Sequence, residues 1–284
     1  MRFFIALMGL CLLPMALQAQ SVSRVEFASE ELGRNMPYIV YLPAGYEDGE
    51  LDYPVLYLLH GAFGNEQNWV SNGRVVPVLN DLIEAGTIPP LIVVMPDGGN
   101  NWWANGNDEP MQTAFFNDLI PHIEGTYNTI KDRKGRMLAG LSAGGFGTVN
   151  YILQEPDTFV SAAALSPAVY VPTPPDHSAA HRSLVFQTDG VFDQAVWDSV
   201  NYPSFIDDYL AQDTVVPLYL NTGDHDTFDI AYHAAVLYQK LREHQPNDVE
   251  YRVIDGDHQW VVWQDTIGDA ITYMTGFASW PMAK

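Results

Sequence analysis

The sequence predicts the α/β class, with a mostly parallel central sheet covered by helices on both faces. Short apolar segments bounded by turn residues alternate along the chain with longer segments of helical periodicity. The chain has 284 residues, 47% of them hydrophobic, which is enough for a sizeable core. A Gly-x-Ser-x-Gly pattern lies where a strand is expected to give way to a helix. In such sheets ligands bind at the carboxyl ends of the strands, so a site is expected there.

Strands are expected where short apolar runs are stopped by Gly, Pro, Asp or Asn. Continuous apolar runs such as LIVVMP suit strands that are buried on both faces, as in parallel sheets. The expected strand segments are 38–46, 53–61, 91–99, 136–142, 159–166, 216–223 and 249–256.

Helices are expected between these strands, because apolar residues recur there at a spacing of three or four. The first is expected to end at Gly86, and most of the chain after 256 is expected to be helical. The segment 168–214 is rich in Pro and Asp and is expected to be an insertion or cap within a single domain spanning 21–284. The other expected helices are 75–86, 115–127, 143–154 and 228–244.

The charge balance limits the classes of partner that the chain is expected to bind. Acidic residues outnumber basic ones by 35 to 13, which gives a net charge of −22. A surface of this sign argues against a nucleic acid or an anionic membrane as partner.

The first twenty residues have the plan of a secretory signal peptide, with one positive charge, an apolar stretch, and then small and polar residues. Cleavage is expected near Ala19, and Pro14 interrupts an apolar run that is already short for a membrane anchor. The single cysteine, Cys11, lies inside this segment, so the mature protein has no thiol nucleophile and no disulfide. The sequence therefore predicts export to a periplasm or to the medium.

The segment AGLSAGG contains the strongest chemical signal. Gly140 and Gly144 flank Ser142 at the minus-two and plus-two positions, which permits a sharp turn that lifts the serine hydroxyl above the sheet edge. The helix N-terminus below it favours a developing anion. A Gly-rich turn that only needs small residues for packing is the alternative. A phosphate loop is disfavoured, because no Gly-Lys-Ser/Thr follows.

A serine nucleophile needs a base and an orienting acid, which follow it in the order acid, then histidine. Of the histidines after Ser142, His258 lies just after the last expected strand, and we predict that it is the base. His233 and His244 fall within an expected helix, and His177 and His181 fall in the insertion.

An oxyanion hole is expected from two backbone N–H groups. Ala143 directly follows the serine, and Ala62, in the segment HGAFG, follows an expected strand. A simple glycine turn is the alternative for the second segment.

Five segments together resemble the esterase D family of α/β-hydrolases, over roughly residues 35–265. That family includes feruloyl and acetylxylan esterases, S-formylglutathione hydrolases and mycolyltransferases, and the chain is most similar to its secreted feruloyl-esterase-like branch. The resemblance implies the α/β-hydrolase fold, with Ser142 as nucleophile, His258 as base, and Ala62 and Ala143 as oxyanion amides. The matching segments are YPVLYLLHGAFGNEQNW, LIEAGTIPPLIVVMPDGG, DLIPHIEGTY, GRMLAGLSAGGFGT and DGDHQWVVW.

The acid lies in the segment TGDHDTFD. Asp224 and Asp226 both follow a strand, so spacing leaves them tied. The family's Gly-x-x-Asp pattern falls on Asp226, and the resemblance therefore implies Asp226 as the acid. Asp224 is then expected to support the loop, and Asp229 to serve the next helix through the helix dipole.

Two other roles remain open for this acidic segment. Asp226 or Thr227 is a possible helix cap. A calcium or zinc site made from Asp224, Asp226, His225 and Asp257 is conceivable, but the segment lacks EF-hand or H-x-x-x-H spacing. We expect no metal and no cofactor.

Four aromatic residues are candidate substrate contacts: Phe63, Trp102, Trp103 and Trp260. An aromatic wall favours an aryl or acyl group or a sugar ring, although packing alone also explains large residues. No basic cluster marks a phosphate or carboxylate site.

The sequence thus predicts a serine carboxylic-ester hydrolase acting on a small-molecule or polysaccharide-linked ester. Alternatives are an acyltransferase, a siderophore esterase, a thioesterase resembling S-formylglutathione hydrolase, and a non-catalytic carbohydrate-binding relative.

Overall fold

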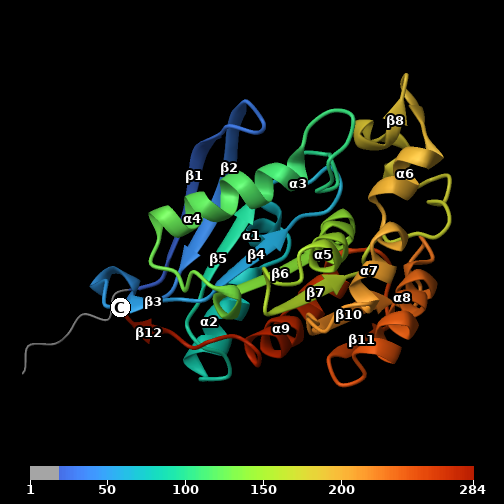
Figure 1. Cartoon of the computed structure of the whole chain (residues 1–284). Helices are drawn as coiled ribbons and strands as arrows, with labels where there is room; N and C mark the ends of the chain where they lie inside the picture. The colour runs from blue at the N-terminus through green and yellow to red at the C-terminus, as the bar shows by residue number, and fades with distance from the viewer. Residues whose placement is uncertain (1–18) are drawn as a thin grey trace, which may run out of the picture.

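An eight-stranded sheet forms the centre of the molecule (Figure 1). The computed structural model describes residues 19–284, so nearly all of the expected signal peptide lies outside the described residues. The strand order is β1-β2-β5-β4-β6-β7-β10-β11; β2 pairs antiparallel with both of its neighbours, β1 and β5, and all the other neighbouring strands pair in parallel. The prediction of a mostly parallel α/β sheet is confirmed.

The strands of the main sheet are five to nine residues long, and half of them are wholly buried. Two further pairs of very short strands lie outside the sheet: β3 (Leu51–Asp52) with β12 (Met282–Ala283), and β8 (Gln187–Thr188) with β9 (Val191–Phe192). The main strands are β1 (Ser21–Ser29), β2 (Arg34–Leu42), β4 (Val55–Leu59), β5 (Ile92–Pro96), β6 (Arg136–Leu141), β7 (Ser161–Leu165), β10 (Leu218–Gly223) and β11 (Val249–Ile254).

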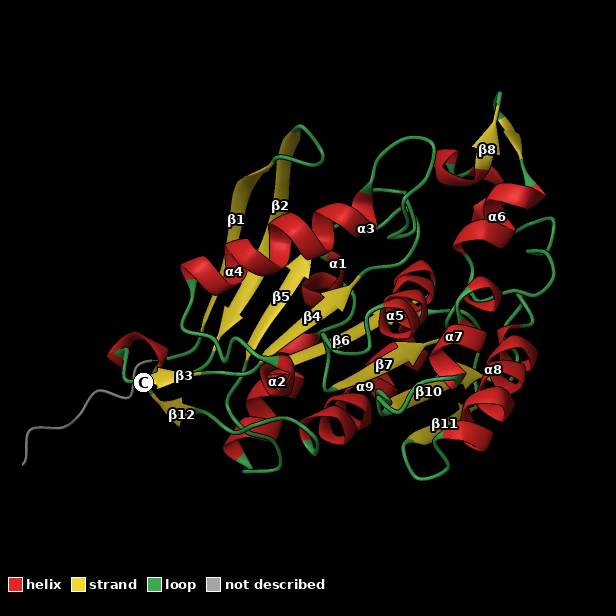
Figure 2. Cartoon of the chain, in the orientation of Figure 1, coloured by secondary structure: helices red, strands yellow, loops and turns green. Residues whose placement is uncertain are grey.

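Helices follow most of the parallel strands, as Figure 2 shows. The expected helix at 115–127 is a π-helical turn at Phe115–Leu119 followed by α4, and α3 extends it backwards to Met111. The helices are α1 (Asn68–Ser71), α2 (Val75–Glu84), α3 (Met111–Ala114), α4 (Ile120–Thr126), α5 (Ala143–Gln154), α6 (Gln194–Val200), α7 (Ile206–Leu210), α8 (Ile230–His244) and α9 (Trp260–Thr275).

Two apolar cores lie on the two faces of the sheet. Successive side chains of a strand point to opposite faces, so Tyr57 and Leu59 of β4 join one core while Leu56 and Leu58 join the other. Helices α3, α4, α5 and α8 pack on the first core, and α2 and α9 pack on the second. This explains why β4 reads as a continuous apolar run rather than an alternating one.

Within the segment 168–214, α6 and the β8–β9 pair lie beyond the carboxyl ends of β6 and β7, whereas α7 returns beside α5 on the way to β10 (Figure 1). It consists of short 3₁₀ turns, α6, α7 and the β8–β9 pair. No regular periodicity marked these elements in the sequence, because each is only a few residues long.

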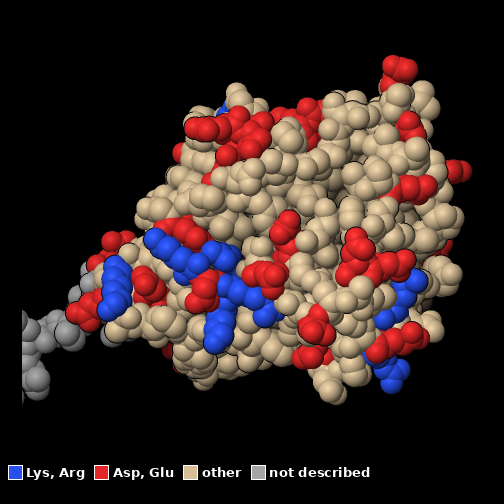
Figure 3. Space-filling view, viewed as in Figure 1, with Lys and Arg blue, Asp and Glu red and all other residues tan. Residues whose placement is uncertain are grey.

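No helix within residues 19–284 has both the length and the apolar character required to span a bilayer. Figure 3 shows acidic side chains spread over the face in view, with Lys and Arg in one group at the left and a smaller group at the lower right.

Candidate active site

Ser142 lies on a tight turn between β6, which ends at Leu141, and α5, which begins at Ala143. Its backbone has φ 54° and ψ −115°, a conformation that is strained for a residue other than glycine. The turn needs the glycines on both sides. A Cβ on Gly140 would lie 2.4 Å from the carbonyl of Gly144, and a Cβ on Gly144 would lie 2.6 Å from the carbonyl oxygens of Leu59 and His60.

The structure brings Ser142, His258 and Asp226 together in one hydrogen-bonded chain. His258 Nε2 lies 2.9 Å from Ser142 Oγ, and His258 Nδ1 lies 2.8 Å from Asp226 Oδ2. In this arrangement a neutral imidazole donates from Nδ1 to the carboxylate and accepts the serine proton at Nε2.

Asp226 is shielded from solvent. Its side chain has 0% exposure, and its second oxygen, Oδ1, accepts a hydrogen bond of 3.0 Å from the N–H of Phe228. Both oxygens are therefore satisfied. The rings of Phe228 and Trp263 pack edge-on against the His258 imidazole at 4.9 Å and 5.0 Å, which fixes its plane.

Two other aspartates tie the loop of Asp226 to the loop of His258. Asp257 Oδ1 accepts from the N–H groups of His258 and Thr227, at 2.6 and 2.9 Å. Asp224 Oδ1 accepts from the N–H of Gly256 at 3.0 Å. The N–H groups of His258 and Thr227 lower the pKa of Asp257, and that of Gly256 lowers the pKa of Asp224. The structure thus places Asp224 as the loop support that the sequence suggested.

The N-cap of α8 is a different residue from the two that the sequence suggested. Asp229 occupies the N-cap of α8 with a left-handed backbone, φ 56°, and its side chain makes no capping hydrogen bond. Neither Asp226 nor Thr227 is the N-cap. The left-handed turn at Asp229 determines where α8 starts, and the sequence carried no signal for it.

The amides of Ala62 and Ala143 are both available for an anion. Ala143 opens α5, where the first N–H groups have no acceptor inside the helix. Ala62 lies in the turn after β4, and in the described part of the chain its N–H donates to no acceptor. Ala143 follows Ser142 in the chain, and Ala62 lines the same cavity as Ser142.

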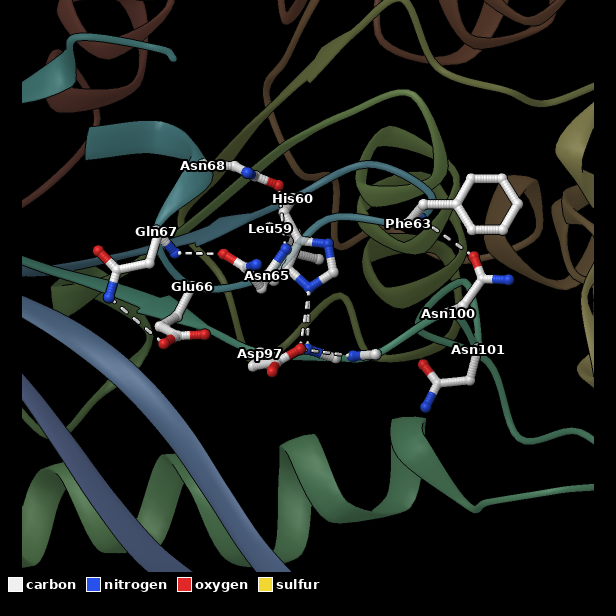
Figure 4. A network of polar contacts seen from close by, with 12 residues as sticks. Leu59, His60, Phe63, Asn65, Glu66, Gln67, Asn68, Asp97, Asn100 and Asn101 are labelled. Carbon is white, nitrogen blue, oxygen red and sulfur yellow. Dashed lines mark hydrogen bonds and ion pairs between the residues drawn. The ribbon is translucent and has the colours of Figure 1, made fainter. Parts of the chain in front are cut away.

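His60 ties the turn that carries Ala62 to the loop after β5, and Figure 4 shows the contacts of His60 with that loop. Its Nδ1 lies 2.8 Å from the carbonyl oxygen of Gly61, which can only accept, and its Nε2 accepts from the N–H of Gly98 at 3.0 Å. The two contacts require a neutral ring, so the 3.6 Å approach of Nε2 to Asp97 is not an ion pair. Sequence reasoning missed this role, although the HG pair before the turn offered a signal.

A cavity of about 390 Å³ opens beside Ser142. Phe63, Trp102 and Trp260 line it, as the sequence predicted for an aromatic wall. Phe63 is 60% exposed at the mouth, whereas Trp102 is only 3% exposed and forms an inner wall.

Trp103, which the sequence grouped with these residues as a candidate substrate contact, does not line the cavity. It is 2% exposed, its indole N–H donates to the carbonyl of His60 at 3.0 Å, and its ring lies against Gly98 and Gly147. Trp102 and Trp103 both have left-handed backbones, which turn their neighbouring side chains to different places. Trp103 therefore supports the turn of Ala62 from behind.

The only group within residues 19–284 with metal-ligand spacing is Asp224, His225 and Asp255, all of them exposed. Asp226 and Asp257, which the sequence offered as further ligands, are engaged with His258 and its neighbours. Two of the four residues considered for a calcium or zinc site, Asp226 and Asp257, therefore already have hydrogen-bond partners within the protein.

The sheet order and the turn at Ser142 define the α/β-hydrolase fold. The family model Esterase, described as "Putative esterase", matches residues 29–274. The chain belongs to this esterase family, and the predicted resemblance is confirmed.

Individual relatives support the same class. The chain is 35% identical over 161 residues to an endo-1,4-β-xylanase/feruloyl esterase of Xylanibacter ruminicola, which covers 54% of this chain and 22% of that protein. It is 23% identical over 271 residues to an acetyl esterase of Caldicellulosiruptor saccharolyticus, which covers 90% of this chain and 98% of that protein. The chain spans only 22% to 31% of the length of the first curated relatives it matches.

Among solved structures, a ferulic acid esterase superimposes with a TM-score of 0.78 at 27% identity, covering 92% of this chain and 99% of that one.

Proposed function

We propose that this chain is an exported serine carboxylic-ester hydrolase that uses Ser142, His258 and Asp226 and needs no cofactor. The observation that carries the proposal is the continuous hydrogen-bonded chain from the buried Asp226 carboxylate through His258 to the Ser142 hydroxyl, 2.8 and 2.9 Å long in its two links.

In the first half of the reaction, Ser142 Oγ attacks the ester carbonyl carbon and its proton passes to His258 Nε2. The carbonyl oxygen becomes an oxyanion, which the N–H groups of Ala62 and Ala143 stabilise. The intermediate then expels the alcohol, which leaves with the proton from Nε2. An acyl group remains on Ser142.

In the second half, water gives a proton to Nε2 and attacks the acyl carbon. The acid is released and Ser142 regains its proton. His258 Nδ1 keeps its proton throughout and donates it in a hydrogen bond to Asp226. The ionised Asp226 thereby holds the imidazole in the required tautomer and stabilises the imidazolium.

We further propose that the substrates are feruloyl or acetyl esters of plant polysaccharide, or other small acyl esters. The named activities of the relatives support this substrate class. The aromatic residues Phe63 and Trp260 in the cavity lining offer faces for an aryl group or a sugar ring.

A panel of esters tests the function. Short-chain nitrophenyl esters, methyl ferulate, acetylated xylan and S-formylglutathione are incubated with the wild type and with Ser142→Ala. We expect turnover of at least one carboxylic ester by the wild type and loss of most of it in the folded variant. Turnover that survives in Ser142→Ala would exclude the mechanism.

Export rests on the sequence of residues 1–20. The expected mature N-terminus lies near residue 20, and N-terminal sequencing of the protein secreted by its host measures it. A protein that keeps residue 1 and stays inside the cell would contradict this part of the proposal.

A further inference from the structure

The cavity beside Ser142 has one permanently charged residue in its lining, Arg182. None of the described residues that line it is Asp or Glu, although the chain has 35 acidic residues against 13 basic ones. In a chain with a net charge of −22, a cation in a cavity without carboxylates is a local reversal of sign. The sequence did not reveal it, because Arg182 lies in the insertion, far along the chain from Ser142.

Arg182 lies next to the turn that carries the oxyanion amide. It ends the 3₁₀ turn Ala179–Arg182, and its guanidinium carbon lies 5.4 Å from the centre of the Phe63 ring. Phe63 directly follows Ala62. A cation over an aromatic face is attracted to it, so the ring orients the guanidinium at the cavity mouth.

Asn100 anchors both partners of this pair. Its side-chain oxygen accepts from the N–H of Phe63 at 3.1 Å, the bond drawn in Figure 4. Its backbone carbonyl accepts from Oγ of Ser183, the residue after Arg182, at 2.6 Å. Ser183 is fully buried. The two chain segments that carry the cation and the ring are therefore tied to each other through Asn100.

The guanidinium has no anionic partner within residues 19–284. Four other arginines, Arg24, Arg34, Arg136 and Arg252, each pair with a glutamate. None of the ion pairs or side-chain hydrogen bonds of the described residues involves Arg182. Its planar fork of N–H donors matches the two oxygens of a carboxylate.

We propose that Arg182 is a specificity-determining residue that binds a carboxylate carried by the ester substrate. The inference rests on the ester hydrolysis proposed above and adds a substrate class to it: esters whose acyl or alcohol part bears a carboxylate. Bound there, the substrate supplies the counter-ion that the protein itself does not.

Two matched ester pairs test this, one for each position of the carboxylate. On the acyl side they are the mono-4-nitrophenyl ester of terephthalic acid and its carboxamide analogue. On the alcohol side they are the butyrates of 4-hydroxybenzoate and 4-hydroxybenzamide. The value of kcat/KM is measured for wild type, Arg182→Gln and Arg242→Gln. Arg242 is an exposed arginine in the last turn of α8, which leads into the amino end of β11. The cavity lies at the carboxyl ends of the strands, so the Arg242 variant loses the same charge away from the cavity.

In at least one pair, Arg182→Gln should lower kcat/KM for the carboxylate ester about tenfold relative to its amide partner, the loss expected for a charge-assisted contact. Arg242→Gln should leave that ratio unchanged, and added salt should weaken the wild-type preference. Equal ratios in wild type and Arg182→Gln for both pairs, with neutral turnover that depends on Ser142, would overturn this inference alone. If the wild type hydrolyses no ester, the proposed function fails and this inference fails with it.

Discussion

At the scale of single residues, three aspartates within eight positions have three different surroundings. Asp226 is buried against His258, Asp224 holds the N–H of Gly256, and Asp229 starts α8 without a side-chain bond. The three aspartates lie only two or three residues apart, so their position in the sequence does not distinguish them. What separates them is burial and the direction that the backbone gives each carboxylate.

Substitution of each aspartate by asparagine should therefore damage turnover in the order 226, then 224, then 229. Asp226→Asn removes the charge that orients and stabilises the imidazolium, a loss of up to ~10⁴ in kcat in serine proteases. Asp229→Asn should leave the rate nearly unchanged and alter stability by about 0.3–1 kcal/mol at most. Steady-state kinetics and melting temperatures measure both. A dead Asp224→Asn beside an active Asp226→Asn would reverse the assignment.

Asp257 gives a prediction about pH. The N–H groups of His258 and Thr227 lower its pKa, so its stabilising effect is complete above the ordinary aspartate pKa of about 3.9 and is lost as the pH falls through the lower folded value. The melting temperature of Asp257→Ala should accordingly fall below that of the wild type at neutral pH, and the difference should shrink below about pH 4. Thermal unfolding between pH 3 and pH 8 tests this; a difference that stays constant over that range would contradict it.

At the scale of elements, the turn from β6 into α5 depends on backbones that approach too closely for a side chain. A Cβ on Gly140 would lie 2.4 Å from the carbonyl of Gly144. Gly140→Ala should therefore destabilise the protein by about 1–3 kcal/mol or prevent folding, because the turn must shift to admit the methyl group.

Gly125 in α4 is the matched control for this substitution. A Cβ there meets nothing within 4 Å, so Gly125→Ala should be neutral or stabilise by roughly 0.5–1 kcal/mol through helix propensity. Chemical denaturation of both variants measures the contrast. Equal effects would show that the close approach at Gly140 carries no energetic consequence.

The sequence predicted those elements whose apolar pattern is strong. Residues 143–154 were expected to be a helix and are α5, and the strand segments from 53 to 256 each contain an observed strand. Strand β1 was missed, since it lies at the edge of the sheet and most of its residues are exposed.

Side-chain direction was harder to predict, because it depends on backbone conformations that leave no pattern. Positive φ angles at Trp102 and Trp103 direct one indole into the cavity wall and the other behind the Ala62 turn. The left-handed Asp229 likewise determines where α8 starts. Arg182 was missed for a topological reason, since only the folded insertion brings it to Ser142.

At the scale of the whole molecule, the carboxyl edge of the sheet gathers Ser142 from β6, Asp226 from beyond β10 and His258 from beyond β11. All three loops are held by hydrogen bonds within the protein. The proposed chemistry thus requires no metal ion to assemble the site.

A chelator should consequently leave turnover unchanged, and added calcium or zinc should not raise it. The exposed Asp224, His225 and Asp255 are the described residues best spaced to hold an ion, so His225→Ala is the matched variant. Activity lost in chelator and restored by calcium or zinc would return the acidic loop to a metal-binding role.

The central claim is that Ser142 is the nucleophile and that His258 activates it. Fluorophosphonate labelling followed by peptide mapping tests it most directly, with wild type, Ser142→Ala and His258→Ala compared at equal protein concentration. We predict one adduct, on Ser142 of the wild type, no adduct in Ser142→Ala, and much slower labelling in His258→Ala. An adduct on a different residue, or unchanged labelling of Ser142→Ala, would contradict the claim.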